Sequence, residues 1–292
     1  MPKYTARALR QAACDWLAQG TPAVVVSVAE IKGSTPREAG TRMLVSAQHV
    51  HGTIGGGHLE WQAIDLARHA MAEQNTAEQE PDLPEASWLK TFALGPALGQ
   101  CCGGIATLRF ATLNSAELST WQLPPSRLHI ELHGAGHVGQ AIIRLLRDLD
   151  CTARWIDTRD TDDTAPGLPD QAMLAALPDH ITWLPTDCPE AEVTDAPAGA
   201  CHLVLTHRHD LDLRIIEAVL RRGDAAFAGL IGSQTKRAKF LHRLADRGLS
   251  PDQLATMVCP IGLPGLTGKE PSVIAISVVA QLLQRMPRSP ST

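Results

Sequence analysis

Three glycines in the segment HGAGHVG have the spacing of a phosphate-binding turn. Gly134, Gly136 and Gly139 follow the apolar run LHIELH and precede a run with helical periodicity. In such a strand-turn-helix the glycines permit a tight turn and close backbone approach, and the helix N-terminus offers unpaired amides and a partial positive charge. Asp157 ends the next predicted strand, where a dinucleotide-binding domain places its ribose-binding acid. The pattern predicts a Rossmann-type domain and leaves open whether its ligand is NAD.

The segment GLIGSQTKR is a second candidate for an anion contact. Ser233 is a good N-cap, yet Lys236 and Arg237 then fall in the first helical turn, where cations oppose the helix dipole. A bound anion or partner would reverse that effect, so we expect Lys236 and Arg237 to contact one. For Lys239 and the cations after it, a solvated basic helix face is the simpler interpretation.

Two adjacent cysteines, Cys101 and Cys102, lie in the glycine-flanked loop GQCCGG. A thiolate there could contact a soft metal, a sulfur-bearing ligand or a persulfide. The alternative is two small residues packed beneath a turn, because cysteine is often simply buried. The spacing alone does not choose between the two.

Other loops of the same region could receive an anion. Gly55, Gly56 and Gly57 form a second glycine-rich junction between a predicted strand and a predicted helix. The segment STPREAGTR adds hydroxyl and guanidinium groups from Ser34, Thr35, Arg37 and Arg42. Several such loops in one domain predict a ligand.

Two further motifs resemble known functional patterns but lack residues that those patterns require. THRHDLD resembles the H-x-H-x-D-H pattern of binuclear metal hydrolases, but its acid comes one residue early and its last histidine is missing. GLPGLTGKE resembles a P-loop, but Leu263 replaces the first glycine and Glu270 replaces the Ser or Thr that would bind magnesium. We therefore predict neither a metal site nor nucleotide hydrolysis.

The elements that must position these residues fall into two groups, both of α/β class. The N-terminal part mixes helices and short strands, and residues 127–292 alternate strands with helices. Such alternation predicts a doubly wound parallel sheet with helices on both faces. We predict an N-terminal α/β domain at 1–113, a polar linker at 114–126 and a Rossmann-like domain at 127–292.

Composition narrows the function class. The chain has 292 residues and a formal net charge of −5, with 4% aromatic residues, so a nucleic-acid or membrane-surface partner is not expected. The longest apolar run is too short for a bilayer span, and the N-terminus lacks the apolar stretch of a secretory signal. Seven scattered cysteines are typical of a reducing compartment, so a cytoplasmic location is expected.

Taken together, the motifs resemble one family, the xanthine dehydrogenase accessory proteins (XdhC) of the wider XdhC/CoxI group. The resemblance is carried, in the family's order, by STPREAGTRMLV, GTIGGGHLE, LGPALGQCCGG, HGAGHVGQAI, THRHDLDL, GLIGSQTKRAKF and CPIGLPGLTGKEP. Gly57 and the cysteine pair favour the XdhC branch over the CoxI branch. TDDTAPGLP, which follows Asp160, departs from the family's usual Phe-Pro signature.

The resemblance implies an accessory factor of purine catabolism rather than an enzyme. Such proteins bind the molybdenum cofactor (molybdopterin), protect it while a cysteine desulfurase replaces an oxo ligand on molybdenum by sulfide, and deliver it to apo-xanthine dehydrogenase. A cofactor phosphate would bind near Gly136 or Ser233, and Cys101 or Cys102 would face the molybdenum. An NAD-dependent oxidoreductase is the main alternative, and an interaction scaffold without a ligand is the third. A homodimer is compatible with the resemblance, although no interface is evident in the sequence.

Overall fold

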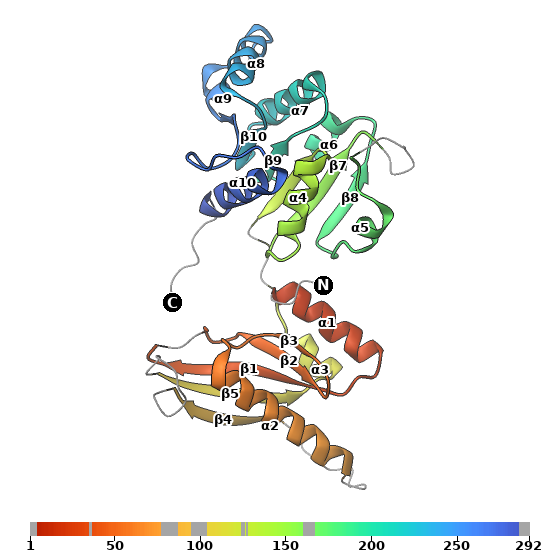
Figure 1. Ribbon diagram of the computed structural model, residues 1–292, viewed down its shortest axis with the longest axis vertical. Helices are drawn as coiled ribbons and strands as arrows, with labels where there is room; N and C mark the ends of the chain where they lie inside the picture. The colour runs from red at the N-terminus through yellow and green to blue at the C-terminus, as the bar shows by residue number, and fades with distance from the viewer. Residues whose placement is uncertain are drawn as a thin grey trace. The chain divides into compact units, whose positions relative to one another are not determined.

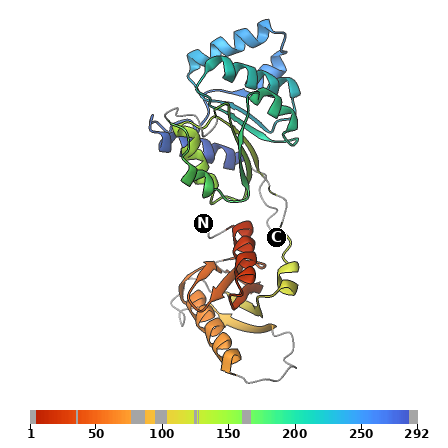
Figure 2. The same cartoon turned by 90° about the vertical axis from the view of Figure 1, so that its right-hand side faces the viewer.

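The chain forms two compact units, residues 2–124 and 125–292 (Figures 1 and 2). A computed structural model describes residues 5–34, 37–76, 87–94, 104–123, 126, 128–159 and 167–285. The cysteine pair Cys101 and Cys102 therefore lies outside the described residues.

The first unit is an antiparallel sheet with helices on both faces. Its strands have the order β3-β2-β1-β5-β4. The elements are α1 (Ala6–Ala18), β1 (Ala23–Lys32), β2 (Arg42–Ser46), β3 (Val50–Gly52), α2 (Gly57–Thr76), β4 (Ser87–Ala93), β5 (Ile105–Thr112) and α3 (Ser115–Ser119). Alternate residues of β1 point to opposite faces, so Val24 and Val26 pack in the cluster beneath α2 while Val25 packs in the cluster beneath α1.

The range 114–126, predicted as a linker, is partly folded onto this unit. Asn114 caps α3, with its Oδ1 accepting the Glu117 backbone N–H at 2.8 Å. Glu117 is buried and forms a bidentate pair with Arg109, and Trp121 is buried beside it. The prediction of a linker was therefore wrong for the first half of the range. The boundary between the two units falls at 124/125, within it.

The second unit confirms the predicted α/β class and the doubly wound parallel sheet. Its six strands have the order β11-β10-β9-β6-β7-β8, and every pairing is parallel. The strands are β6 (His129–His133), β7 (Thr152–Asp157), β8 (Ile181–Pro185), β9 (Cys201–Val204), β10 (Phe227–Leu230) and β11 (Met257–Val258). The chain starts at β6, winds outward through β7 and β8, and then resumes at β9 on the other side. The order therefore reverses between β6 and β9, which is where such folds bind ligands.

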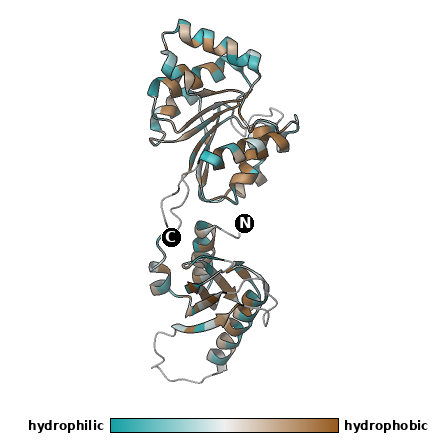
Figure 3. Ribbon diagram, turned by 90° about the vertical axis from the view of Figure 1, so that its left-hand side faces the viewer, coloured by the Kyte–Doolittle hydropathy of each residue, from teal (hydrophilic) through white to brown (hydrophobic). Residues whose placement is uncertain are grey.

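Helices cover both faces of this sheet. They are α4 (His137–Leu146), α5 (Gln171–Ala175), α6 (Pro189–Asp195), α7 (His209–Arg222), α8 (Gln234–Asp246), α9 (Pro251–Ala255) and α10 (Pro271–Arg285). Residues of α4 and α10 share one apolar cluster, and residues of α6, α7 and α8 share another. Hydrophilic and hydrophobic residues alternate along the strands in Figure 3, and the polar residues Glu131, His133 and His202 are nevertheless buried, as expected for a sheet covered on both faces.

Among the described residues, no helix combines the length and the apolar character that crossing a membrane requires.

Candidate functional site

Two of the three motif glycines are required by packing. Gly134 follows β6 with φ +126°, and a Cβ there would lie 2.3 Å from the carbonyl oxygen of Leu205, which follows β9. A Cβ on Gly139 would lie 2.2 Å from the carbonyl oxygen of Gly134. These glycines bring α4 and the ends of β6 and β9 into direct backbone contact, as the Rossmann fingerprint requires.

Gly136 has no such packing role. Within the described part of the chain, a Cβ at this position would meet no atom within 4 Å. Gly136 is the N-cap of α4, and no side chain forms a capping hydrogen bond there, in contrast to the Thr5 cap of α1. The first-turn amides of α4 are thus not used by a cap, at the carboxyl end of β6 where the strand order reverses. The space and the amides together form a cradle for an anionic group.

Asp157 is at the end of β7 as predicted, but its carboxylate is already used. It is 4% exposed; Oδ2 accepts the Ala135 N–H at 2.6 Å and Oδ1 accepts the Arg159 N–H at 3.0 Å. The Arg159 guanidinium binds both oxygens at 2.9 Å. Burial opposes ionisation, but these hydrogen bonds outweigh it and hold the pKa of Asp157 below its usual value. The carboxylate holds the glycine loop and offers no unused oxygen to a ribose.

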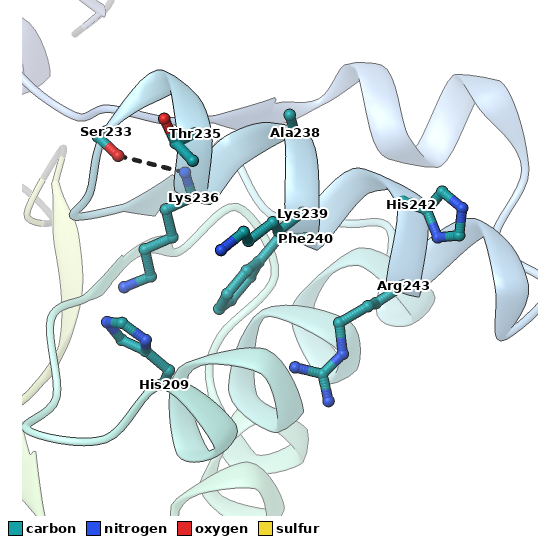
Figure 4. Close-up of a pocket in the computed structure, with 9 residues that line it drawn as sticks. All are labelled: His209, Ser233, Thr235, Lys236, Ala238, Lys239, Phe240, His242 and Arg243. Carbon is teal, nitrogen blue, oxygen red and sulfur yellow. Dashed lines mark hydrogen bonds between the residues drawn. The ribbon is translucent and has the colours of Figure 1, made fainter.

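Ser233 is confirmed as the N-cap of α8, where its Oγ accepts the Lys236 backbone N–H at 3.2 Å (Figure 4). The Lys236 side chain differs from the expectation of an anion contact. Its Nζ lies 2.7 Å from Oδ2 of the buried Asp212 and donates to the Ile231 carbonyl at 2.9 Å. The dipole penalty of this lysine is thus offset by a carboxylate of the protein itself.

The groove between α7 and α8 is basic (Figure 4). It has a cavity volume of 630 Å³, its lining includes Lys239 and Arg243, and the buried Phe240 forms part of its wall. Both cations are exposed, which fits the solvated basic face predicted for this part of α8. Arg247, further along, instead pairs with Glu217.

A larger cavity of 740 Å³ lies where the chain leaves β10 and β11. The segments GLIGSQTKR and CPIGLPGLTGKEP both line it, and they contribute Arg237 and Lys269 respectively. Lys269 was missed because it stands in the segment whose P-loop resemblance fails. The signal that could have identified it is topological, since loops after neighbouring parallel strands meet at one edge of the sheet.

In the first unit, the Gly55–Gly57 junction is closed by an internal acid. Oε2 of Glu60 accepts the Thr53 hydroxyl at 2.5 Å and the backbone N–H groups of Ile54 and Gly56 at 3.1 and 3.0 Å. The anion expected at this loop is therefore supplied by α2 itself. Glu60 was the residue that sequence reasoning missed, although GGGHLE places an acid one turn after the glycines.

The flanks of the cysteine loop are fixed. The Leu94 N–H donates to the Gly104 carbonyl at 2.7 Å, and a Cβ on Gly104 would lie 2.5 Å from the Ser34 carbonyl oxygen. The cysteine loop therefore leaves and rejoins the sheet beside the start of the STPREAGTR segment. Cys101 and Cys102 themselves lie outside the described residues, so their contacts stay a prediction.

The segment THRHDLD forms the start of α7. Asp210 pairs with its neighbour Arg208 rather than with a histidine. Within the described ranges, no group of three or more His, Cys, Asp or Glu side chains is placed to hold a metal ion.

Comparison with known proteins identifies the family. Residues 16–80 match the profile of the XdhC and CoxI family, and residues 130–282 match that of the XdhC Rossmann domain. The chain belongs to the XdhC family. Membership of this family supports an accessory role for the protein.

Two individual proteins are similar to this XdhC-family chain. The uncharacterized protein YqeB of Escherichia coli K12 is 26% identical over 266 residues, which are 91% of this chain and 44% of that protein. The chain thus spans less than half the length of this curated relative. A crystal structure described as a xanthine dehydrogenase from Bacillus halodurans aligns over 97% of both chains with a TM-score of 0.68 and 16% identity, which shows a shared fold.

Proposed function

We propose that this chain is a molybdenum cofactor chaperone. In this proposal it binds the pterin cofactor, protects it while a cysteine desulfurase replaces an oxo ligand on molybdenum by sulfide, and delivers it to xanthine dehydrogenase. It acts as a maturation factor and not as an enzyme. Family membership supports the accessory part of this role, and the geometry at Gly136 supports the binding of a phosphate-bearing ligand.

The single observation that carries the proposal is the unfilled position at Gly136. Packing requires glycine at positions 134 and 139, whereas no atom of the described residues lies within 4 Å of a Cβ built on Gly136. A glycine without a packing requirement at an uncapped helix N-terminus is what close approach of a phosphate demands. The molybdenum cofactor carries such a terminal phosphate.

The state of Asp157 favours this cargo over NAD. An NAD-dependent oxidoreductase would use an acid at the end of this strand to accept hydrogen bonds from a ribose. Both oxygens of Asp157 are instead bound by Arg159 and the Ala135 N–H. A ligand held mainly through its phosphate does not need this acid.

The cysteine pair is proposed to contact the molybdenum of the bound cofactor. A soft, sulfur-coordinated molybdenum suits a thiolate, so Cys101 or Cys102 is proposed to approach it. Cys101→Ser and Cys102→Ser variants should retain less molybdenum than the wild type. Unchanged stoichiometry in both would remove the cysteines from the proposal without affecting the phosphate cradle.

The deciding experiment uses the full chain. The protein is incubated with molybdenum cofactor and separated by gel filtration, and its peak is analysed for molybdenum and for oxidised pterin fluorescence. The wild type should retain both, and Gly136→Val should lose most of both because its side chain fills the cradle. Ala255→Val, at an exposed position in α9, is the matched control and should behave as the wild type.

Two outcomes would contradict the proposal. One is a wild-type protein that retains no molybdenum or pterin, and the other is a folded Gly136→Val protein that retains as much as the wild type. A parallel NADH titration tests the alternative, since saturable binding with substrate-dependent oxidation would favour an oxidoreductase.

A further inference from the structure

A small cavity in the first unit is lined by two arginines, Arg37 and Arg42. It has a volume of 240 Å³ and is called the arginine pocket below. Its lining includes Thr5, Ala6, Arg37, Thr41, Arg42 and Trp121. This volume is below the roughly 300 Å³ at which pockets for drug-sized ligands begin, so it suits a small ion or one group of a larger ligand.

The arginine pocket contains two arginines. Among the described residues that line it, Arg37 and Arg42 are the ionisable ones. The chain as a whole carries a net charge of −5, so the pocket stands apart from the average surface. Two guanidinium groups at one small cavity favour a divalent anion.

Helix α1 adds to the positive potential. Thr5 and Ala6, at its N-terminus, line the pocket, and the first turn of this 13-residue helix contains no acid. The first intrahelical bond is donated by Leu9 to the Thr5 carbonyl, so the Ala6 N–H precedes the helical ladder. Its dipole therefore acts in the same direction as the two arginines.

Arg42 stacks on Trp121, and the nearby acid Glu117 is hydrogen-bonded to another arginine, Arg109. The Arg42 guanidinium carbon lies 5.2 Å from the centroid of the Trp121 ring. The nearby carboxylate of Glu117 is taken by Arg109 at 2.8 and 3.1 Å and by the Trp121 indole N–H at 3.3 Å. Burial opposes the ionisation of Glu117, but these bonds, with a smaller contribution from Arg42, keep its pKa below the usual value. Glu117 stays ionised and bound to Arg109, and Arg42 remains oriented by stacking.

We infer that the arginine pocket binds a phosphate group, with Arg37 and Arg42 as its charged ligands and Thr41 as a hydroxyl donor. Arginine pairs bind phosphate through parallel N–H···O bonds, and the hydroxyl supplies a further donor. The described residues of this site all belong to the first unit, whereas Gly136 belongs to the second. The segment STPREAGTR supplies both arginines. In this inference it has a phosphate-binding role of its own in the first unit.

The test measures phosphate binding in a protein whose Rossmann cradle is blocked. Inorganic phosphate is titrated into the full-length Gly136→Val protein by calorimetry at low salt, and the titration is repeated after adding Arg42→Gln or Arg37→Gln. Each charge removal should raise the dissociation constant about tenfold or more. Arg10→Gln removes the same charge from an exposed position on α1 and should leave the dissociation constant unchanged.

Folding is controlled separately. Arg42→Gln loses the contact with Trp121, so its thermal unfolding is recorded, and Arg42→Lys, which keeps the charge, should retain part of the affinity. Arg37 is exposed, so Arg37→Gln tests the inference even where Arg42→Gln is unstable. A second arm replaces inorganic phosphate by glycerol phosphate: comparable affinity assigns the pocket to a terminal phosphomonoester, and loss of binding assigns it to the free ion.

The two experiments distinguish a failure of the arginine-pocket inference from a failure of the proposed chaperone role. Equal phosphate affinity in Gly136→Val with and without the arginine substitutions, or no binding to Gly136→Val at all, would overturn the arginine pocket and leave the cofactor experiment untouched. Loss of cofactor retention in the wild type would overturn the chaperone role, while phosphate binding to the arginine pocket would still be measurable.

Discussion

Lys236 Nζ lies 2.7 Å from Oδ2 of Asp212, a fully buried carboxylate in the first turn of α7. The other oxygen, Oδ1, accepts the Thr206 N–H at 2.9 Å and the Thr206 hydroxyl at 2.7 Å. Thr206 follows β9 and Lys236 follows β10. The pair therefore joins the loops of two neighbouring strands at the carboxyl edge of the sheet, where the family motifs meet.

Removing the lysine from this pair should be costly. Lys236→Met leaves the Asp212 carboxylate buried without its cation, and we expect a loss of about 3–5 kcal/mol in the free energy of unfolding. Lys239→Met, one turn along α8 and exposed, should change it by less than about 0.5 kcal/mol. Urea unfolding followed by circular dichroism measures both. Equal stability of the two variants would show that the ion pair is dispensable.

The motif glycines should separate into two classes. In Gly139→Ala the new Cβ meets the Gly134 carbonyl, so α4 must move away from β6 at a cost of about 1–3 kcal/mol or more. Gly136→Ala adds a Cβ in open space and changes only an N-cap, which costs about 1 kcal/mol or less. Thermal unfolding of the two variants checks the order. A Gly136→Ala protein as unstable as Gly139→Ala would contradict the assignment of Gly136 to ligand contact.

The fold was predictable where the sequence signal is strong. In the Rossmann domain the sequence predicts strands at LHIELH, TARWID, CHLVLTH and FAGLIG, and these form the four central strands β6, β7, β9 and β10. It predicts no strand at β8 or β11, which are the two edges of the sheet. Ile181–Pro185 is half exposed and ends in proline, and Met257–Val258 has two residues. Edge strands bury one side only, so they lack the continuous apolar pattern of a central strand.

Site residues were predictable by type but not by partner. The glycine spacing correctly located the turn after β6, because backbone geometry restricts which residues fit there. The contacts of the charged residues were harder to predict, because Lys236 and Asp157 each bind a group of the protein itself and not a ligand. Asp212 lies 24 residues before Lys236, and no local pattern in the sequence joins them. Glu60, which closes the Gly55–Gly57 loop, was nearer and could have been recognised.

The glycine loop of the first unit should depend on Glu60. Glu60→Ala removes the acceptor of the Ile54 and Gly56 amides and of the Thr53 hydroxyl, and we expect a loss of about 1–3 kcal/mol. Glu60→Gln keeps one carbonyl acceptor and should lose less. Hydrogen exchange of the Ile54 and Gly56 amides reports the loop directly and should accelerate in Glu60→Ala. The exposed variant Glu38→Ala is the control, and unchanged exchange in Glu60→Ala would refute the capping role.

Two stacked histidines beneath α7 should make stability fall in mild acid. His133 and His202 are buried, their rings lie 5.8 Å apart, and His133 Nδ1 has no hydrogen-bond partner in the described part of the chain. Burial, together with the neighbouring His202 and Arg154, holds the pKa of His133 well below its usual value. Burial also lowers the pKa of His202 to about 4, although Glu131 opposes the shift.

Because both histidines stay neutral in the folded protein, the unfolded chain binds more protons below its histidine pKa of 6.5. The free energy of unfolding is therefore unaffected by them above pH 6.5 and falls as the pH drops from 6.5 towards 4. Each histidine contributes a slope of about 1.4 kcal/mol per pH unit in that window. Urea unfolding between pH 7.5 and 5 measures how the free energy of unfolding depends on pH. In His202→Asn the slope of this dependence should be smaller by about 1.4 kcal/mol per pH unit. His242→Asn is the control, because the His242 side chain is 79% exposed, and it should keep the wild-type slope. If His202→Asn also kept the wild-type slope, the buried histidine pair would not be the cause of the acid destabilisation.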